Sequence, residues 1–261
     1  MLTTTASYRL LASDMARSLD RTASAPAVKR DSDAYLAKIS EIKSIDDFLS
    51  NDRVYRYAMK AFGLSDMAYA KAFMRKALEG GIDDKNSFAN SLADTRYREF
   101  VATFNFARYG ETTTVFTRTG QGTVDKYVQQ TLEESAGKDN EGVRLALYFQ
   151  RKASGITNAL HVLADPALLK VVQTALGILP ESGTQSMDRQ AALIDARLNV
   201  EDLQDAEKLQ AFLTRFTSLY ELENRPAVAA SPALILIGQP VGAGIGMDLI
   251  MSLQNLKLGG S

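Results

Sequence analysis

Catalytic or metal-binding chemistry in this chain would have to use very few residues. His161 is the only histidine, and the chain has no cysteine. Disulfides, cysteine nucleophiles and thiolate metal sites are therefore excluded, and a serine–histidine–aspartate triad would depend on His161 alone. Because His161 lies in the apolar helical stretch HVLADP, we interpret it as a partly buried or surface histidine without a catalytic role.

The glycines of the stretch Gly242-Ala243-Gly244-Ile245-Gly246 resemble a phosphate-binding loop. A dinucleotide fingerprint needs a preceding strand, a following helix and an acidic residue about 20 positions further on. Only 15 residues follow Gly246, and the stretch has no P-loop lysine. We therefore interpret these glycines as sites of close packing or as a flexible joint, and we infer no cofactor.

Paired acidic residues are the remaining candidates for acid–base chemistry. They fall near the ends of expected helices, where capping and the helix dipole explain them. An acid–base pair would require burial, and nothing matches the spacing of a calcium loop. We predict no catalytic, cofactor-binding or metal-binding residues and no enzymatic activity. The pairs are Asp46-Asp47, Asp83-Asp84, Glu133-Glu134 and Glu201-Asp202.

The composition is that of an ordinary globular protein. Of the 261 residues, 46% are hydrophobic and 23% are charged, and 30 basic residues nearly balance 31 acidic ones. This balance provides no basic field for nucleic acid or an anionic membrane surface. We infer neither a nucleic-acid partner nor a small-molecule substrate.

Helical periodicity organises the chain around Asn51–Leu64, NDRVYRYAMKAFGL. Its apolar residues recur at spacings of three, four and seven, Asn51 or Asp52 can cap the helix, and Gly63 stops it. The same arrangement of cap, apolar face and glycine recurs at Asp165–Ile178, DPALLKVVQTALGI. We therefore predict an all-α, multi-helix bundle with a duplicated helical core, residues 35–106 and 148–219, and an apolar C-terminal tail.

The pattern divides the chain into five parts. Residues 109–123 are rich in glycine and threonine, so we expect an exposed connector there, with an isolated strand at 113–117 as the alternative. The parts are an N-terminal helix (1–26), a first helical half (27–108), the connector (109–123), a second helical half (124–225) and the apolar tail (226–261). The helices expected inside the halves cover 28–42, 44–49, 51–62, 65–79, 86–92, 95–107, 124–134, 142–156, 157–163, 166–176, 187–198 and 205–220.

The two ends of the chain are the candidate partner-binding segments. Residues 3–25 predict one amphipathic helix, which either packs on the core or associates with another copy. Residues 226–247 carry no charge, but Pro232 and Pro240 interrupt them, so we expect the tail to meet the core or a partner and not to span a membrane. The N-terminus lacks the apolar core of a signal peptide. The predicted partner-binding residues are Tyr8, Leu11, Met15, Leu249, Ile250 and Leu253.

Long blocks of the chain resemble a known family. The run VKRDSDAYLAKISEIKSIDDFLSNDRVYRYAMKAFGLSDMAYAKAFMRKAL, with NSFANSLADTRYREFVATFNF and GTVDKYVQQTLEESAGKDNEGVRLALYFQRKASGI, is similar to the alphaproteobacterial domain of unknown function 1217. Such proteins are commonly encoded among flagellar genes. The resemblance therefore implies a flagellar structural or assembly protein, bound to flagellar proteins or to itself, in the cytoplasm or at the flagellum. The alternatives are a cytosolic chaperone or regulator of flagellar subunits and an enzyme of unknown reaction.

Overall fold

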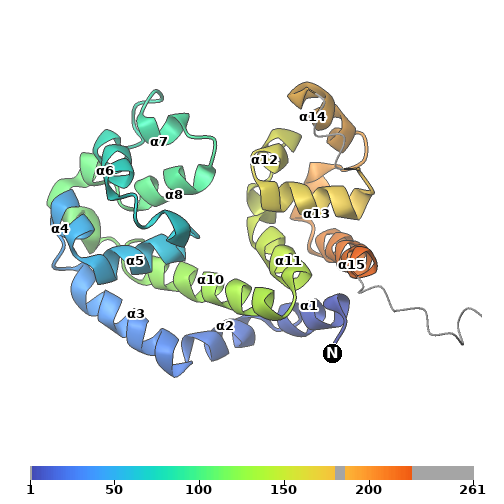
Figure 1. Ribbon diagram of the computed structural model, residues 1–261, viewed down its shortest axis with the longest axis horizontal. Helices are drawn as coiled ribbons and strands as arrows, with labels where there is room; N and C mark the ends of the chain where they lie inside the picture. The colour runs from blue at the N-terminus through green and yellow to red at the C-terminus, as the bar shows by residue number, and fades with distance from the viewer. Residues whose placement is uncertain (1, 180–185, 225–261) are drawn as a thin grey trace, which may run out of the picture. The chain divides into compact units, whose positions relative to one another are not determined.

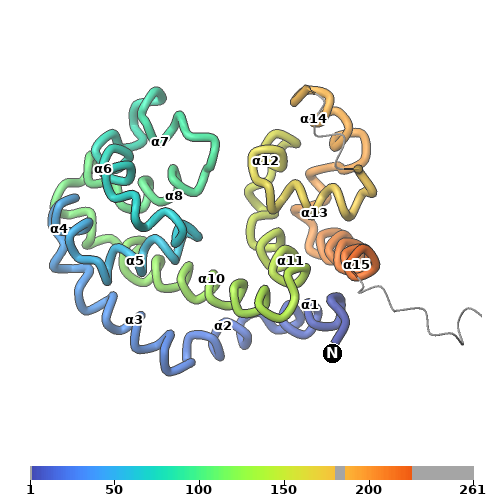
Figure 2. Tube along the Cα trace, viewed as in Figure 1, coloured from blue at the N-terminus to red at the C-terminus, as the bar shows by residue number. Residues whose placement is uncertain are grey.

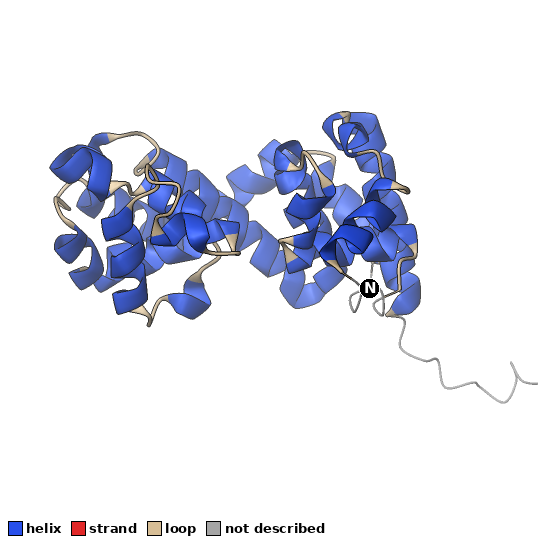
Figure 3. Cartoon of the chain, turned by 90° about the horizontal axis from the view of Figure 1, so that it is seen from above, coloured by secondary structure: helices blue, strands red, loops and turns tan. Residues whose placement is uncertain are grey.

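Every regular element in the described residues, 2–179 and 186–224 of this computed structural model, is a helix, so the predicted all-α class is confirmed (Figure 3). The chain from Met1 to Glu223 forms one compact unit. The α-helices are α1 (Thr4–Ala12), α2 (Met15–Ala23), α3 (Pro26–Ile39), α4 (Ile45–Ser50), α5 (Asp52–Ala61), α6 (Lys71–Gly80), α7 (Phe88–Ser91), α8 (Thr95–Thr103), α9 (Phe106–Tyr109), α10 (Gln121–Asp139), α11 (Glu141–Lys152), α12 (Ala159–Leu163), α13 (Pro166–Leu176), α14 (Met187–Asp195) and α15 (Ala206–Glu223). Short 3₁₀ helices are η1 (Ser65–Met67), η2 (Gly110–Val115), η3 (Ala153–Gly155) and η5 (Val200–Gln204).

The first hydrophobic core lies among α3 to α9 and the first half of α10. Phe48 is fully buried there, and its ring centroid lies 4.7 Å from that of Phe104 and 6.0 Å from that of Phe100. Aromatic contacts of this kind add to the stabilisation that comes from burying apolar area. Local signals position the ring, because Ser44 and Asp47 form the capping box that begins α4.

The second hydrophobic core lies among α11 to α15 and includes Tyr8 from α1. Asp165 caps α13 by accepting hydrogen bonds from the backbone N–H groups of Ala167 and Leu168. Pro166 suits the first turn of this helix, because its fixed φ is helical and it has no N–H to satisfy. Gly177 ends the helix in the left-handed conformation, with φ of 63°.

α10 and the N-terminal helices connect the two cores. α10 packs against α5 of the first core and against α11 of the second, while α1 packs on α11 and α15 (Figures 1 and 2). Gly142 permits the close approach of α1 and α15 to α11, because a Cβ added there would lie 2.8 Å from Thr4 Cγ2 and even nearer to the Tyr220 ring. The cores are thus joined by continuous helical packing inside one compact unit.

The single helix expected over residues 3–25 is wrong, since it is divided into α1 and α2. Asp14 accepts a hydrogen bond of 3.0 Å from the backbone N–H of Arg17 and so begins a new helix. A short acidic side chain of this type competes with the helical backbone pattern and favours a cap. The expected end of this segment at residue 25 agrees with the structure, because α3 begins at Pro26.

Several helix boundaries also differ from the expectation. α6 begins at Lys71, after η1, so Tyr69 is 79% exposed and is not part of an apolar helix face. α8 ends at Thr103. α10 continues to Asp139, past its expected end at residue 134, because Asn140 ends it and caps α11 within one residue.

The connector at 109–123 is only partly exposed, and it contains η2 where a strand was the alternative. Thr114 is buried and its hydroxyl donates a 2.8 Å hydrogen bond to the carbonyl oxygen of Ile42. The buried Thr119 hydroxyl similarly donates to the carbonyl of Phe116 at 2.7 Å. Threonine-rich sequence therefore forms part of the interior here by satisfying backbone carbonyls.

The duplication of the two halves stays a prediction, with some agreement in local structure. In each half a short helix, α4 or α12, precedes a longer one, α5 or α13, and each longer helix is followed by a glycine of positive φ, Gly63 or Gly177. Phe48 and Val162, which are separated by the same 114 positions as Asn51 and Asp165, are both fully buried. The predicted tail, 226–261, lies outside the described residues. Among the residues described, no helix is both long and apolar enough to cross a membrane.

Candidate functional site

A cavity of about 470 Å³ lies between helices that belong to the two cores. Its wall combines charged side chains with alanine, proline and phenylalanine. The charged and polar lining residues are Asp94, Arg96, Glu99, Lys126, Gln130, Arg144, Tyr148, Arg151, Lys152 and Asp165. The other lining residues are Ala61, Phe62, Gly63, Ala93, Ala164, Pro166 and Ala167.

Asp94 and Arg96 form the wall contributed by the beginning of α8. Asp94 caps the helix through the backbone N–H of Arg96, and it binds the Arg96 guanidinium through contacts of 2.7 to 3.0 Å. The guanidinium also donates to the carbonyl of Gly63 at the end of α5. Burial alone would raise the pKa of Asp94, but its hydrogen bonds with Arg96 and the Arg96 charge outweigh burial and lower that pKa.

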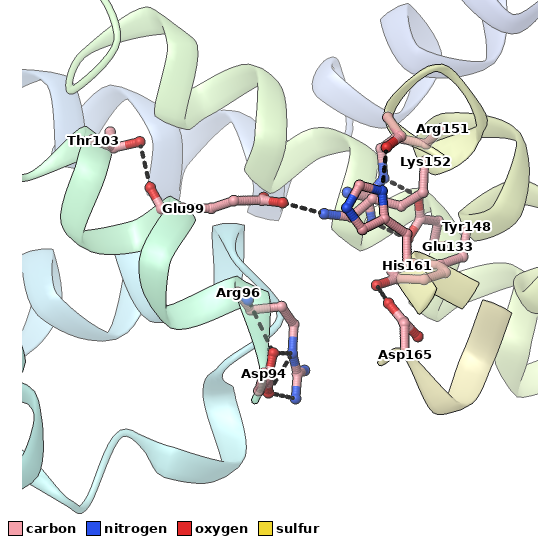
Figure 4. Close-up of polar contacts among 11 residues, drawn as sticks. Asp94, Arg96, Glu99, Thr103, Glu133, Tyr148, Arg151, Lys152, His161 and Asp165 are labelled. Atoms are coloured by element: carbon pink, nitrogen blue, oxygen red, sulfur yellow. Dashed lines mark hydrogen bonds and ion pairs between the residues drawn. The ribbon is translucent and has the colours of Figure 1, made fainter. Parts of the chain in front are cut away.

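Tyr148 and Asp165 form the wall contributed by α11 and α13 (Figure 4). The Tyr148 hydroxyl donates a 2.6 Å hydrogen bond to Asp165 Oδ2, while Asp165 Oδ1 accepts from the N-terminal backbone of α13. Burial, this hydrogen bond and the Asp165 charge all raise the pKa of Tyr148. The hydroxyl therefore remains a hydrogen-bond donor at neutral pH.

Glu133 and Arg151 form an ion pair behind the wall of the cavity. Glu133 exposes only 2% of its side chain, and its two oxygens accept hydrogen bonds of 2.6 and 2.8 Å from Arg151. Burial would lower the pKa of Arg151, but the hydrogen bond to Glu133 and its charge outweigh burial and raise it. The interpretation of Glu133 as a helix-end residue is wrong, because α10 continues past it to Asp139.

Lys152 and Glu99 join the two sides of the cavity. Lys152 at the end of α11 reaches Glu99 Oε1 on α8 at 2.6 Å (Figure 4). Glu99 comes from the helices of the first core and Lys152 from those of the second. The pair therefore links the two groups of helices directly.

Lys126 of α10 has a different environment from the other lining cations. Its ammonium lies 5.2 Å from the centroid of the Phe62 ring. No carboxylate of the described residues forms an ion pair with it, whereas Arg96, Arg144, Arg151 and Lys152 each have one. Desolvation lowers the pKa of Lys126. The charges of Lys152 and Arg151 lower this pKa further, whereas the charge of Glu99 raises it.

His161 is exposed on α12, which agrees with its interpretation as a partly buried or surface histidine. Its Nδ1 lies 3.1 Å from the carbonyl oxygen of Gly155 (Figure 4). Within the described part of the chain, no group of three or more acidic, histidine or cysteine side chains is placed to hold a metal ion. The residues Gly242–Gly246 lie outside the described residues.

The structure separates the predicted partner-binding residues from the cavity. Tyr8 is fully buried in the second core, where its hydroxyl donates to Gln150 and Gln210. Leu11 and Met15 are partly buried and pack against the same core. This helix face therefore packs on the core, which was one of the two alternatives for the segment. Leu249, Ile250 and Leu253 lie outside the described residues.

Sequence reasoning missed the cavity residues of α11. Arg144, Tyr148 and Arg151 follow one another at spacings of four and three, which places them on one face of a helix. This spacing was a usable signal, because two arginines and a tyrosine on one helix face are unusual for a core-facing surface. Asp165 was identified only as a helix cap.

The described fold is that of an all-α helical protein with two cores and one charged cavity between their helices. Residues 61–209, more than half of the chain, match the model of the family described as protein of unknown function, DUF1217. The chain belongs to this family.

One solved structure supports the same relationship. The X-ray crystal structure of protein AGR_C_984 from Agrobacterium tumefaciens is 48% identical in sequence and has a TM-score of 0.79. The similarity covers 85% of this chain and 94% of that chain. No curated protein matches the sequence.

Proposed function

We propose that this protein is a non-enzymatic component or assembly factor of the flagellum that works through helical protein–protein contacts. The observation that carries the proposal is membership of the DUF1217 family. The resemblance to this family implies a gene that is commonly located among flagellar genes. The partner is a flagellar protein or a second copy of the chain.

Exposed apolar side chains on the terminal helices support a role in contacts. Leu10 of α1 and Leu222 of α15 each expose 66% of their surface, although both helices pack on the second core. Exposed leucines on a helix are the type of residue that enters a groove on a partner. The apolar tail residues Leu249, Ile250 and Leu253 remain the predicted second contact.

Deletion of the gene tests the proposal. We expect loss of swimming and of assembled flagella, both restored by the full-length gene. Replacement of Leu249, Ile250 and Leu253 by serine should abolish restoration, whereas the control Gln254→Ala with Asn255→Ala, which changes neighbouring polar residues of the sequence, should restore swimming. A deletion strain that swims with normal flagella would reject the proposal.

The alternative of a cytosolic chaperone or regulator shares this phenotype and differs in location, because such a protein would not be incorporated into the flagellum. The alternative of an enzyme is favoured by the charged cavity. Complementation with Tyr148→Phe distinguishes an enzyme from a protein that acts by contacts, because this change removes a hydroxyl from the cavity and leaves the exposed helix faces intact. Normal swimming with Tyr148→Phe is the result expected for a protein that acts by contacts.

A further inference from the structure

Among the described residues, the cations that line the cavity are paired with a single exception. Five cations line the cavity, and four of them have a carboxylate within ion-pair distance. The paired cations are Arg96 with Asp94, Arg144 with Glu141, Arg151 with Glu133 and Lys152 with Glu99. Lys126 has no such partner in the part of the chain that the structure describes.

Lys126 is exposed, so its ammonium is accessible to an added anion, and no carboxylate of the described residues neutralises it. Two further cations, Lys152 and Arg151, repel it, and the carboxylate of Glu99 that attracts it is already bound by Lys152. Its contact with the face of the Phe62 ring, 5.2 Å from Nζ to the centroid, compensates only in part. An added anion would gain more at this ammonium than at the neighbouring cations, each of which is already paired with a carboxylate.

Asp165 does not supply the missing negative charge. Its Oδ2 accepts the Tyr148 hydroxyl at 2.6 Å and its Oδ1 accepts two backbone N–H groups. These neutral donors fix the carboxylate at the start of α13, and no ion pair joins it to Lys126 within the described residues. The carboxylate therefore acts as a fixed cap on one side of the cavity.

The remaining wall is apolar, which indicates the rest of the ligand. Phe62, Pro166 and alanines from both cores line the cavity together with the charged residues; the alanines are Ala61, Ala93, Ala164 and Ala167. These short apolar side chains leave space for a ligand. Contact with the hydrocarbon part of a ligand would remove apolar surface from water and so favour binding. A volume of about 470 Å³ lies in the range of cavities that hold small organic molecules.

We propose that this cavity binds a small organic anion, in which a carboxylate or phosphate group is attached to an apolar or aromatic body, and that Lys126 Nζ pairs with the anionic group. The apolar body lies against Phe62, Pro166 and the alanines. This site goes beyond the proposed flagellar role and does not depend on it.

The test uses the full-length protein labelled with nitrogen-15 and titrated by two-dimensional NMR with three probes: benzoate, benzyl alcohol and inorganic phosphate. Benzoate should give saturable shifts at residues of the cavity wall, with a dissociation constant in roughly the millimolar range expected for so small a ligand. Benzyl alcohol, which lacks the charge, and inorganic phosphate, which lacks the apolar body, should each bind about tenfold more weakly.

Two matched variants test the role of the ammonium. Lys126→Met keeps an unbranched side chain over Phe62 and should weaken benzoate binding about tenfold. Lys138→Met makes the same change of charge at an exposed position in the last turn of α10 and should leave the affinity unchanged. Lys126→Arg retains a cation and should retain binding, which shows that the site tolerates substitution.

Several results would overturn the proposal. Absence of saturable shifts with benzoate, or shifts confined to residues away from the cavity, would reject the site. Equal weakening by Lys126→Met and Lys138→Met would show a general effect of net charge and reject the role of Lys126. Equal affinity for benzoate and benzyl alcohol would reject recognition of an anion, and equal affinity for inorganic phosphate would reject the apolar subsite.

Discussion

Replacement of Glu133 by glutamine should destabilise the protein strongly, although it removes only one negative charge. The carboxylate exposes 2% of its side chain and accepts both hydrogen bonds from the Arg151 guanidinium. Removing one partner of a fully buried ion pair costs about 3–5 kcal/mol, because the other charge remains buried and unpaired. Since Arg151 keeps 30% of its side chain exposed, water offsets part of this cost, and we expect about 2–3 kcal/mol.

Glu134→Gln is the matched control, because it makes the same chemical change at the next residue of α10. Glu134 exposes 38% of its side chain and lies 3.4 Å from Lys60 Nζ, so its loss should cost less than about 1 kcal/mol. Urea unfolding followed by far-ultraviolet circular dichroism measures both variants. Glu133→Gln should also lower the melting temperature by roughly 5–10 °C. Equal unfolding free energies for the two variants would refute the reasoning, since they would show that burial of the pair has no energetic consequence.

Two further changes test helix packing at Gly142 and electrostatics in the cavity wall. Gly142→Ala should destabilise by about 1–3 kcal/mol in urea unfolding, because the new methyl group collides with the Tyr220 ring. Gly155→Ala, which meets nothing within 4 Å, should be neutral or slightly stabilising; equal effects would contradict the packing around Gly142. Asp94→Asn keeps the cap of α8 but loses the charge that Arg96 binds, so it should cost about 0.5–1 kcal/mol at neutral pH. Because folding lowers the Asp94 pKa below its usual 3.8, the stability from this charge is present above that pH and disappears as pH falls further. Unfolding curves of wild type and Asp94→Asn should therefore converge in acid; a constant difference would contradict this.

Local signals in the sequence were sufficient for much of the fold. Ser44, Asn51 and Asp165 each cap the helix predicted from the apolar pattern that follows them. Gly63 and Gly177 end α5 and α13 with positive φ, as their places after the last apolar residue predicted. These features depend on hydrogen bonds within a few residues, so neighbouring sequence determines them.

Features that depend on distant residues could not be predicted in the same way. The burial of Thr114 requires the carbonyl of Ile42, which lies 72 positions earlier in the chain. The burial of Glu133 requires Arg151 on the next helix. The sequence alone therefore did not predict the burial of these polar residues, because their hydrogen-bond partners come from distant parts of the chain.

The candidate site shows the same division. Asp94 and Asp165 were recognisable as caps from their local positions, but their second partners, Arg96 and Tyr148, gave them a place in the cavity wall. Lys126 carried no local signal, because its distinguishing property is the absence of a counter-charge among helices brought together only by folding. Tyr8 was predicted to face a partner because its apolar helix face looked the same as one that packs on its own core.

The most direct test of the flagellar role is the distribution of the tagged full-length protein, expressed from its own gene, among cytosol, membrane, purified hook–basal bodies and sheared filaments. A structural component should be enriched in the hook–basal bodies or the filaments, and this enrichment should fall when Leu249, Ile250 and Leu253 are replaced by serine. A protein found only in the cytosol would contradict incorporation into the flagellum and would favour the chaperone or regulator.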